Sequence, residues 1–197
     1  MYHQNAVTMK RQKINLRFGV ISLLILLAAF SRLIPHPPNF TPVGAMALFG
    51  AAYFSKRYLA FAVPILAMWL SDLVLNNVVY AQYFDEFTLF YSGFYWTYSA
   101  FIVIGIAGFF LLKRTKPQNI LIASLTASIL FFMVSNFGVW ASGMMYPKSF
   151  SGLIACYAAA IPFFQNTMMG DLIYSSVLFG VFEFAQYKLP LLRLRTI

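Results

Sequence analysis

Long apolar runs separated by short polar connections dominate this chain. A helix needs about 20 apolar residues to cross the hydrocarbon core of a membrane. By this criterion we predict six membrane-spanning segments, at 18–35, 42–54, 59–79, 93–112, 119–140 and 166–186. The second segment reaches only about 20 Å at 1.5 Å per residue, so we expect it in a thinned or protein-lined part of the membrane.

One further apolar stretch, SGLIACYAAAIPFF at 151–164, is too short to span a membrane and contains Pro162. If it crossed, the basic C-terminus would move to the opposite side. We therefore predict a re-entrant or interfacial helix on the outer face. The predicted fold class is an all-α integral membrane protein, a compact six-helix transmembrane bundle with this extra outer helix.

Composition supports the membrane interpretation, because 61% of the 197 residues are hydrophobic and the mean hydropathy is +0.74. A soluble core of this size could not bury so much apolar surface. The net charge of +9 comes from short basic clusters between the apolar runs, which membrane orientation explains better than nucleic-acid binding. The clusters lie within 10–17, 56–57, 113–116 and 188–195.

The basic clusters fall on one side of the predicted topology, and cytoplasmic loops carry the Lys/Arg excess. We therefore expect a multi-pass protein of the inner (plasma) membrane with both termini in the cytoplasm. The predicted organisation is a basic N-terminal tail at 1–17, a single transmembrane domain at 18–187 and a basic C-terminal tail at 188–197.

The sequence lacks the motifs of several common metal sites and enzyme classes. The single Cys156 allows neither an internal disulfide nor a cysteine metal cluster. The sequence contains no Walker motif, H-E-x-x-H or G-x-S-x-G, which argues against an ATPase, a zinc protease or a serine hydrolase. We expect no catalytic residue, no metal and no cofactor.

Ionisable residues inside spans are functional candidates by default. Arg32, Asp72 and Asp171 lie, with Asn136, within about 10 Å of the predicted outer ends of four different spans. They could form a structural network between helices. They could instead line a cavity open to the outer face, in which Arg32 neutralises one carboxylate and the other attracts a cation, a proton or a donor-rich ligand. Glu183 lies near the cytoplasmic end, where it can pair with Lys188.

The connection RLIPHPPNFTPVGA at 32–45 joins this layer to the short second span. Its prolines stiffen the path, and Thr41-Pro42 is typical of a helix N-cap followed by the first helical residue. The loop is either a tight turn between helices or a rigid support that holds His36, Asn39 and Phe40 over a cavity mouth.

Aromatic residues crowd the connection 80–98. They form either an interfacial belt or a lid that stacks on a planar ligand. Trp140 and Asn166 lie at the same level. The candidate solute-binding residues are Arg32, His36, Asn39, Phe40, Asp72, Asn136, Trp140, Asn166 and Asp171.

Small residues at helical spacing, such as Gly44, Ala47 and Ala51, or Ala123 and Ala127, let helices approach closely. They serve packing inside the bundle or docking of another membrane subunit.

The stretches RLIPHPPNFTPVGAMALFGAAYF, SNFGVW and YPKSFSGLIACYAAAIPFFQNTMMGDLIYSSVLFG resemble an uncharacterised family of small bacterial membrane proteins, over most of the chain from Arg32 to Gly180. The architecture is also similar to the substrate-binding S components of energy-coupling factor transporters. That resemblance implies uptake of a vitamin-like micronutrient together with a membrane coupling protein and cytoplasmic ATPases. S components dock through an Ala-xxx-Ala pattern on the first helix. Here Arg32 stands four residues after Ala28, where the second alanine of the pattern would fall, and the nearest Ala-xxx-Ala runs from Ala47 to Ala51 in the predicted second span.

These observations predict a membrane solute-binding or transport protein whose partners are a small solute and the lipid bilayer. Two alternatives stay open. One is a membrane enzyme acting on a lipid or isoprenoid, with Asp72 and Asp171 as acid and base or as Mg²⁺ ligands. The other is a structural or assembly subunit whose polar layer fastens the bundle.

Overall fold

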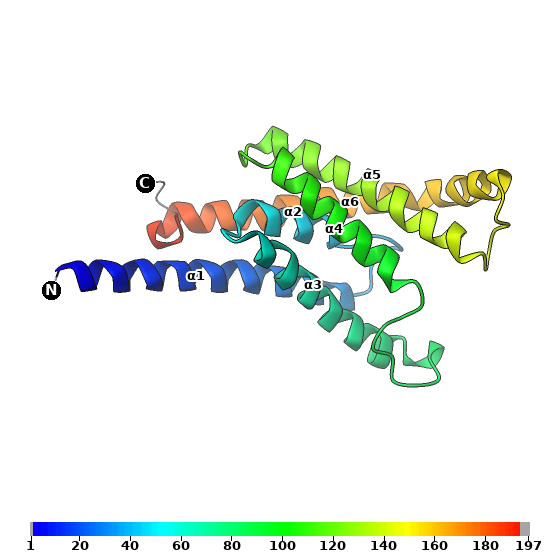
Figure 1. Cartoon of the computed structure of the whole chain (residues 1–197), viewed down its shortest axis with the longest axis horizontal. Helices are drawn as coiled ribbons and strands as arrows, with labels where there is room; N and C mark the ends of the chain where they lie inside the picture. Colours follow the sequence, from blue (N-terminus) through cyan, green and yellow to red (C-terminus); the bar gives the residue numbers. More distant parts are fainter. Residues whose placement is uncertain (1, 194–197) are drawn as a thin grey trace.

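The computed structural model describes the backbone of residues 2–193 and the side chains of residues 16–193. Within this range the chain forms six α-helices joined by turns and short helical segments (Figure 1). The α-helices are α1 (Tyr2–Phe30), α2 (Val43–Tyr53), α3 (Arg57–Val74), α4 (Phe94–Leu111), α5 (Pro117–Ser142) and α6 (Phe150–Lys188). The short segments are η1 (Ser31–Leu33), η2 (Leu75–Val79), η3 (Ala81–Tyr83) and η4 (Pro190–Leu192).

The two ends of the bundle differ in chemistry. The chain termini and the connections α2–α3 and α4–α5 lie at one end (Figure 1), here called the basic end because it carries Lys56, Lys113, Lys116 and Lys188. The loops 80–93 and 143–149 lie at the opposite end, here called the aromatic end. The predicted gathering of the basic clusters at one end of the fold is confirmed for the described residues.

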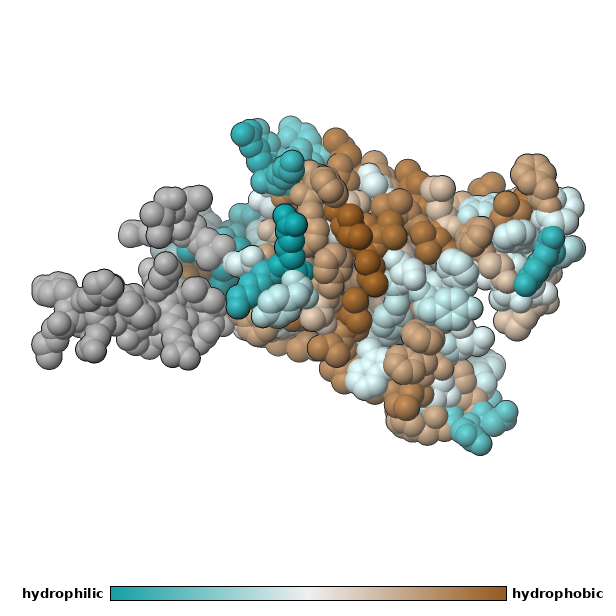
Figure 2. Space-filling model, in the orientation of Figure 1, coloured by the Kyte–Doolittle hydropathy of each residue, from teal (hydrophilic) through white to brown (hydrophobic). Residues whose placement is uncertain are grey.

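The surface between the two ends is apolar. Five helices within the described residues are long and apolar enough to cross a membrane, and large hydrophobic side chains project from all of them. Figure 2 shows hydrophobic residues over the middle of the bundle and hydrophilic residues at its ends. This distribution is that of a membrane protein, since water-soluble proteins rarely expose so large an apolar patch.

The prediction that residues 151–164 form a separate outer helix is wrong. It is the first part of α6, whose 39 residues run without a break through Pro162 and reach about 58 Å, close to twice a hydrocarbon core of about 30 Å. The C-terminal half of α5 packs against this first part of α6. The Tyr157 hydroxyl donates to the Met133 carbonyl at 2.6 Å, and the Phe132 ring packs on Phe164 at 5.0 Å.

The structure gives the conformation of the described parts of the predicted tails. The basic segment before the first span continues the same helix, because α1 begins at Tyr2. After α6, the chain turns back as η4 and packs on α1, and Leu192 is 1% exposed. Residues 194–197 of the predicted C-terminal tail lie outside the described part of the chain.

The short α2 is the centre of the bundle. It contacts each of the other five helices, and of its 11 residues only Ala52 is not buried. Small side chains make this possible: a Cβ on Gly50 would lie 2.8 Å from the Ala60 carbonyl oxygen of α3, and one on Gly108 of α4 would lie 2.8 Å from Ala51 Cβ. The small residues of the second span therefore serve packing inside the chain.

The close approach of α2 and α3 predicts a penalty for added volume. Gly50→Ala should lower the free energy of unfolding by about 1–3 kcal/mol, the usual cost of overpacking, because the nearest atoms belong to backbone and to the Pro64 ring. Thermal unfolding of the detergent-solubilised protein measures this change. Gly19→Ala in α1 is the matched control, since no atom lies within 4 Å of its added Cβ, and it should be neutral or stabilising by up to about 1 kcal/mol.

Candidate functional site

The N-terminus of α2 is buried and takes its capping group from another helix. The first N–H groups of any α-helix have no partner within the helix, and the residue preceding α2, Pro42, makes no side-chain cap. Asp171 of α6 fills the position: its carboxylate accepts from the Ser128 hydroxyl at 2.7 Å and faces the backbone of Gly44 and Ala45 in the first turn of α2. The predicted capping by Thr41 is therefore replaced by a carboxylate distant in sequence.

The contact of Asp171 with α2 is close. The side chain is 2% exposed, and a Cβ on Gly44 would collide with its carboxylate oxygens. Negative charge is stabilising at a helix N-terminus, because the helix dipole leaves partial positive charge there. Asp171 thus has a partner for its charge, and the expectation that it attracts a cation, a proton or a donor-rich ligand stays a prediction.

A cation occupies the opposite end of α2. Arg17 of α1 is buried, and its Nη2 donates to the carbonyl of Tyr53, the last residue of α2, at 3.3 Å. Its Nη1 donates to the Leu192 carbonyl at 2.6 Å and to Gln186 at 3.0 Å. A positive charge at a helix C-terminus is also favourable, so the two ends of α2 carry side chains of complementary sign.

Glu183 belongs to this cluster at the basic end. It has other partners than Lys188, with which the sequence predicts that it can pair. Its carboxylate accepts hydrogen bonds from the Tyr53 hydroxyl and from Thr115. The interaction ties α6 to α2 and to the α4–α5 connection.

The second charged centre lies at the aromatic end, where η1 brings Arg32 beside α3. Arg32 Nη1 lies 2.7 Å from Asp72 Oδ1 and donates to the Ser71 hydroxyl at 2.6 Å. The other oxygen of Asp72 accepts from the Tyr98 hydroxyl at 2.7 Å. The hydrogen bonds found for Arg32 in the described structure all use Nη1, so its remaining guanidinium nitrogens can still donate.

A widened turn follows Asp72. Residues 75–79 form a π-helical segment, closed by a bond from the Tyr80 N–H to the Leu75 carbonyl at 2.7 Å. Such segments occur frequently at functional sites. Asn76 within it is 7% exposed, and its Nδ2 has no hydrogen-bond partner among the described residues. A buried donor without a partner costs about 1–3 kcal/mol, and a bound molecule with an acceptor would recover that cost.

Asn77 holds the aromatic-rich connection after α3, at Thr88, against the end of that helix. Its Nδ2 donates to the Leu73 and Thr88 carbonyls, each at 2.9 Å, and its Oδ1 accepts from the Thr88 N–H at 2.7 Å. Loop 84–92 is thereby held beside the Arg32–Asp72 pair.

These parts line an open cavity of about 340 Å³, within the range of about 300–1,000 Å³ typical of ligand pockets. We call it the first lobe. The ion pair, the Asn76 amide and phenolic or phenyl rings share its wall. It is lined by Arg32, Asp72, Leu75, Asn76, Tyr80, Tyr83, Phe84 and Tyr91. Burial raises the pKa of Tyr91, so its hydroxyl stays protonated and can donate a hydrogen bond.

Of the nine predicted site residues, the structure brings Arg32 and Asp72 together in the first lobe, and the others lie elsewhere. Asp171 caps α2. Asn136 donates to the Phe132 carbonyl of its own helix, at 2.8 Å. Trp140 Nε1 donates to the Pro147 carbonyl at 3.0 Å.

The remaining predicted residues shape the 34–42 loop. Asn166 of α6 donates to the Pro38 carbonyl at 3.0 Å, and the Phe40 ring packs on Tyr174 at 5.7 Å. Asn39 has a left-handed backbone, with φ of 64°, and the His36 ring contacts the neighbouring Pro37 carbonyl. The loop is therefore a turn fixed to α6, and it does not line the first lobe.

Sequence reasoning missed Asn76, Ser71 and Tyr98. The adjacent pair Asn76-Asn77 at the end of an apolar run was an available signal. Ser71 and Tyr98 become site residues only through the approach of α1 and α4 to α3.

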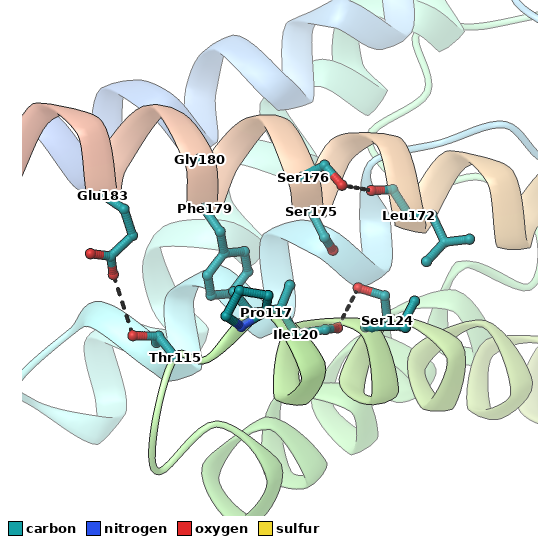
Figure 3. Close-up of a pocket in the computed structure, with 11 residues that line it drawn as sticks. Thr115, Pro117, Ile120, Ser124, Leu172, Ser175, Ser176, Phe179, Gly180 and Glu183 are labelled. Atoms are coloured by element: carbon teal, nitrogen blue, oxygen red, sulfur yellow. Dashed lines mark hydrogen bonds between the residues drawn. The ribbon is translucent and has the colours of Figure 1, made fainter.

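A larger groove of about 490 Å³ lies between α5 and α6 near the basic end (Figure 3). Its hydroxyls Ser124 and Ser176 donate to carbonyls of their own helices, those of Ile120 and Leu172, at 2.9 and 2.7 Å. The charged residue among its lining, Glu183, is bonded to Thr115 at one end of the groove. The groove also holds the buried Ser175 hydroxyl, which has no hydrogen-bond partner among the described residues. The first lobe differs because it combines an unpartnered amide with a charged pair.

A protein-family model matches residues 12–192 of the chain. The chain belongs to DUF6580, a family of unknown function. The expected membership of an uncharacterised family is confirmed in this form. No curated protein and no solved structure matches this member of DUF6580, so its resemblance to S components stays a prediction.

The capping role of Asp171 makes a testable prediction. Asp171→Asn keeps the size of the side chain but removes the charge, and we expect it to lower the free energy of unfolding by about 1–2 kcal/mol, the upper part of the range for a charge at a helix end. Thermal unfolding in detergent measures the loss. Asp85→Asn, at an exposed loop position, is the control and should change stability by less than about 0.5 kcal/mol. Equal stability of the two variants would contradict the capping role.

Proposed function

We propose that this protein binds a small polar solute in the first lobe, as the solute-binding component of a membrane uptake system. One observation carries the proposal: the cavity joins the Arg32–Asp72 pair to the unpartnered Asn76 amide. Membrane proteins keep ionisable groups within spans chiefly at substrate pathways and polar networks. The unpartnered amide favours the former, because it borders a cavity whose bound solute could satisfy it.

Orientation follows from the charge distribution. Because Lys and Arg accumulate on the cytoplasmic side, the basic end of a plasma-membrane protein would face the cytoplasm with both termini, and the first lobe would open outward. An outward-facing site suits capture of a nutrient.

The chemistry of the first lobe defines the solute. Asp72 already has a partner for each oxygen, whereas Arg32, Asn76 and Tyr91 have donors to offer. The tyrosine and phenylalanine rings of the lining can stack on a flat molecule. A planar micronutrient rich in carbonyl or carboxylate oxygens fits this lining, in keeping with the vitamin-like cargo that the S-component resemblance implies.

The energy source would be a partner, since the sequence has no ATPase motif. Ala47 and Ala51 lie inside the bundle, so a coupling protein would dock elsewhere. The groove between α5 and α6 is the best candidate, because Gly180 has open space above it and Ser176 precedes it by one turn, a small-xxx-small spacing that favours helix association.

The alternative functions receive less support. Asp72 and Asp171 have separate partners, which disfavours an acid–base pair acting on a lipid or isoprenoid. A structural subunit would explain Asp171 and Arg17, but it would not explain the unpartnered Asn76.

Asn76→Leu tests the proposal, because it separates binding from folding. It removes a buried donor that has no partner, so the ligand-free variant should unfold at the same temperature as the wild type or a higher one. Mass spectrometry of small molecules extracted from the gently purified proteins should find a species bound to the wild type and reduced at least tenfold in Asn76→Leu.

Asn119→Leu is the matched control, since Asn119 lies at the basic end and donates to the Arg114 carbonyl. It should retain the molecule at the wild-type level. If the wild type retains nothing specific, or Asn76→Leu retains as much as the wild type, solute binding in the first lobe is wrong.

A further inference from the structure

A second cavity, of about 270 Å³, lies between the start of α4 and the end of α5. We call it the second lobe. Its wall includes Tyr91, Trp96, Thr97, Ser135 and Ser142. Tyr91 also lines the first lobe, so one side chain borders both cavities.

The second lobe has its own unpartnered donor. The protein has three tryptophans, and two donate to loop carbonyls: Trp69 to Leu89 at 3.3 Å and Trp140 to Pro147 at 3.0 Å. Trp96 Nε1 is buried without a hydrogen-bond partner among the described residues. Buried indole N–H groups usually find a partner, and this one can only donate.

The position of Trp96 is fixed by close packing. A Cβ on Gly138 of α5 would collide with the indole, and the Phe137 ring lies 5.3 Å from it. The ring cannot easily turn to find a protein acceptor. A bound molecule that carries an acceptor would satisfy it.

We infer that the solute site continues past Tyr91 into the second lobe and that its ligand is an elongated molecule with a hydrogen-bond acceptor near each end. This inference rests on the proposed function of the first lobe. One acceptor meets Asn76 and Arg32, the other meets Trp96, and the middle of the molecule passes Tyr91. The first lobe is near the lower limit of about 300 Å³ for ligand pockets and the second lies below it, whereas together they fall well within the range.

The first test compares two variants in which phenylalanine replaces one tryptophan. Mass spectrometry measures the amount of small molecule that co-purifies with each variant from cells. Trp96→Phe should reduce retention at least tenfold. Trp69→Phe, whose indole N–H serves a loop carbonyl, should retain the wild-type amount. Ser142→Phe fills the second lobe from an exposed position at the end of α5 and should also reduce retention, which covers the case in which Trp96→Phe folds poorly.

The second test uses fluorescence. In the variant Trp69→Phe, Trp140→Phe, Trp96 is the sole tryptophan, and acrylamide quenching reports access to the second lobe. A molecule anchored in the first lobe should shield Trp96, so adding Asn76→Leu should raise the quenching constant at least twofold.

The outcomes separate the two proposals. Retention by Trp96→Phe and Ser142→Phe at the wild-type level, with quenching insensitive to Asn76→Leu, would overturn the second lobe and leave the first lobe intact as the site. A wild type that retains no molecule would overturn both.

Discussion

The residues at both ends of α2 are buried, so the backbone groups there need partners within the protein. At 11 residues this helix covers about 16 Å, about half of a hydrocarbon core. Unsatisfied N–H and C=O groups cost several kcal/mol each in such surroundings. The fold therefore depends on side chains that reach these ends, and Asp171 and Arg17 supply them with the signs that the helix dipole favours.

Other features follow from this arrangement. Gly44 must lack a side chain for Asp171 to approach, and the 34–42 loop must cross α6, where Asn166 and Phe40 hold it. At the other end, the chain after α6 turns back so that the Leu192 carbonyl meets Arg17. The prolines of the loop suit this path, because the chain must turn sharply between η1 and α2 without a continuous helix.

The same constraint divides the charged residues by role. Asp171 and Arg17 are committed to the ends of α2 and stabilise the fold. Arg32 and Asp72 also form a pair, but they border a cavity together with donors that have no protein partner. Because Arg17 also has a buried Nε without a partner among the described residues, the cavity beside the Arg32–Asp72 pair, more than an unsatisfied donor alone, distinguishes the candidate site from the structural centres.

The sequence alone determined the fold class and the approximate spans. Apolar runs, basic clusters and the shortness of the second span are properties of consecutive residues, and the helices Arg57–Val79, Phe94–Leu111 and Pro117–Ser142 begin and end within two residues of the predictions. The prediction failed at 151–164, because this stretch is too short to span a membrane by itself and contains Pro162, whereas in the structure it is the first part of a longer helix. A long helix tolerates an internal proline where neighbouring helices support it, and α5 packs beside this part of α6.

Only the tertiary structure decides which of the polar residues at a similar depth in the membrane belong to the same site. A similar depth in the membrane placed Arg32, Asp72, Asn136 and Asp171 in one predicted site, yet depth along a helix says nothing about the direction of a side chain around it. Whether a carboxylate meets a guanidinium, a helix N-terminus or an open cavity depends on how distant helices rotate and pack. That rotation is set by the small residues around α2 and by the capping of its ends, which no local pattern encodes.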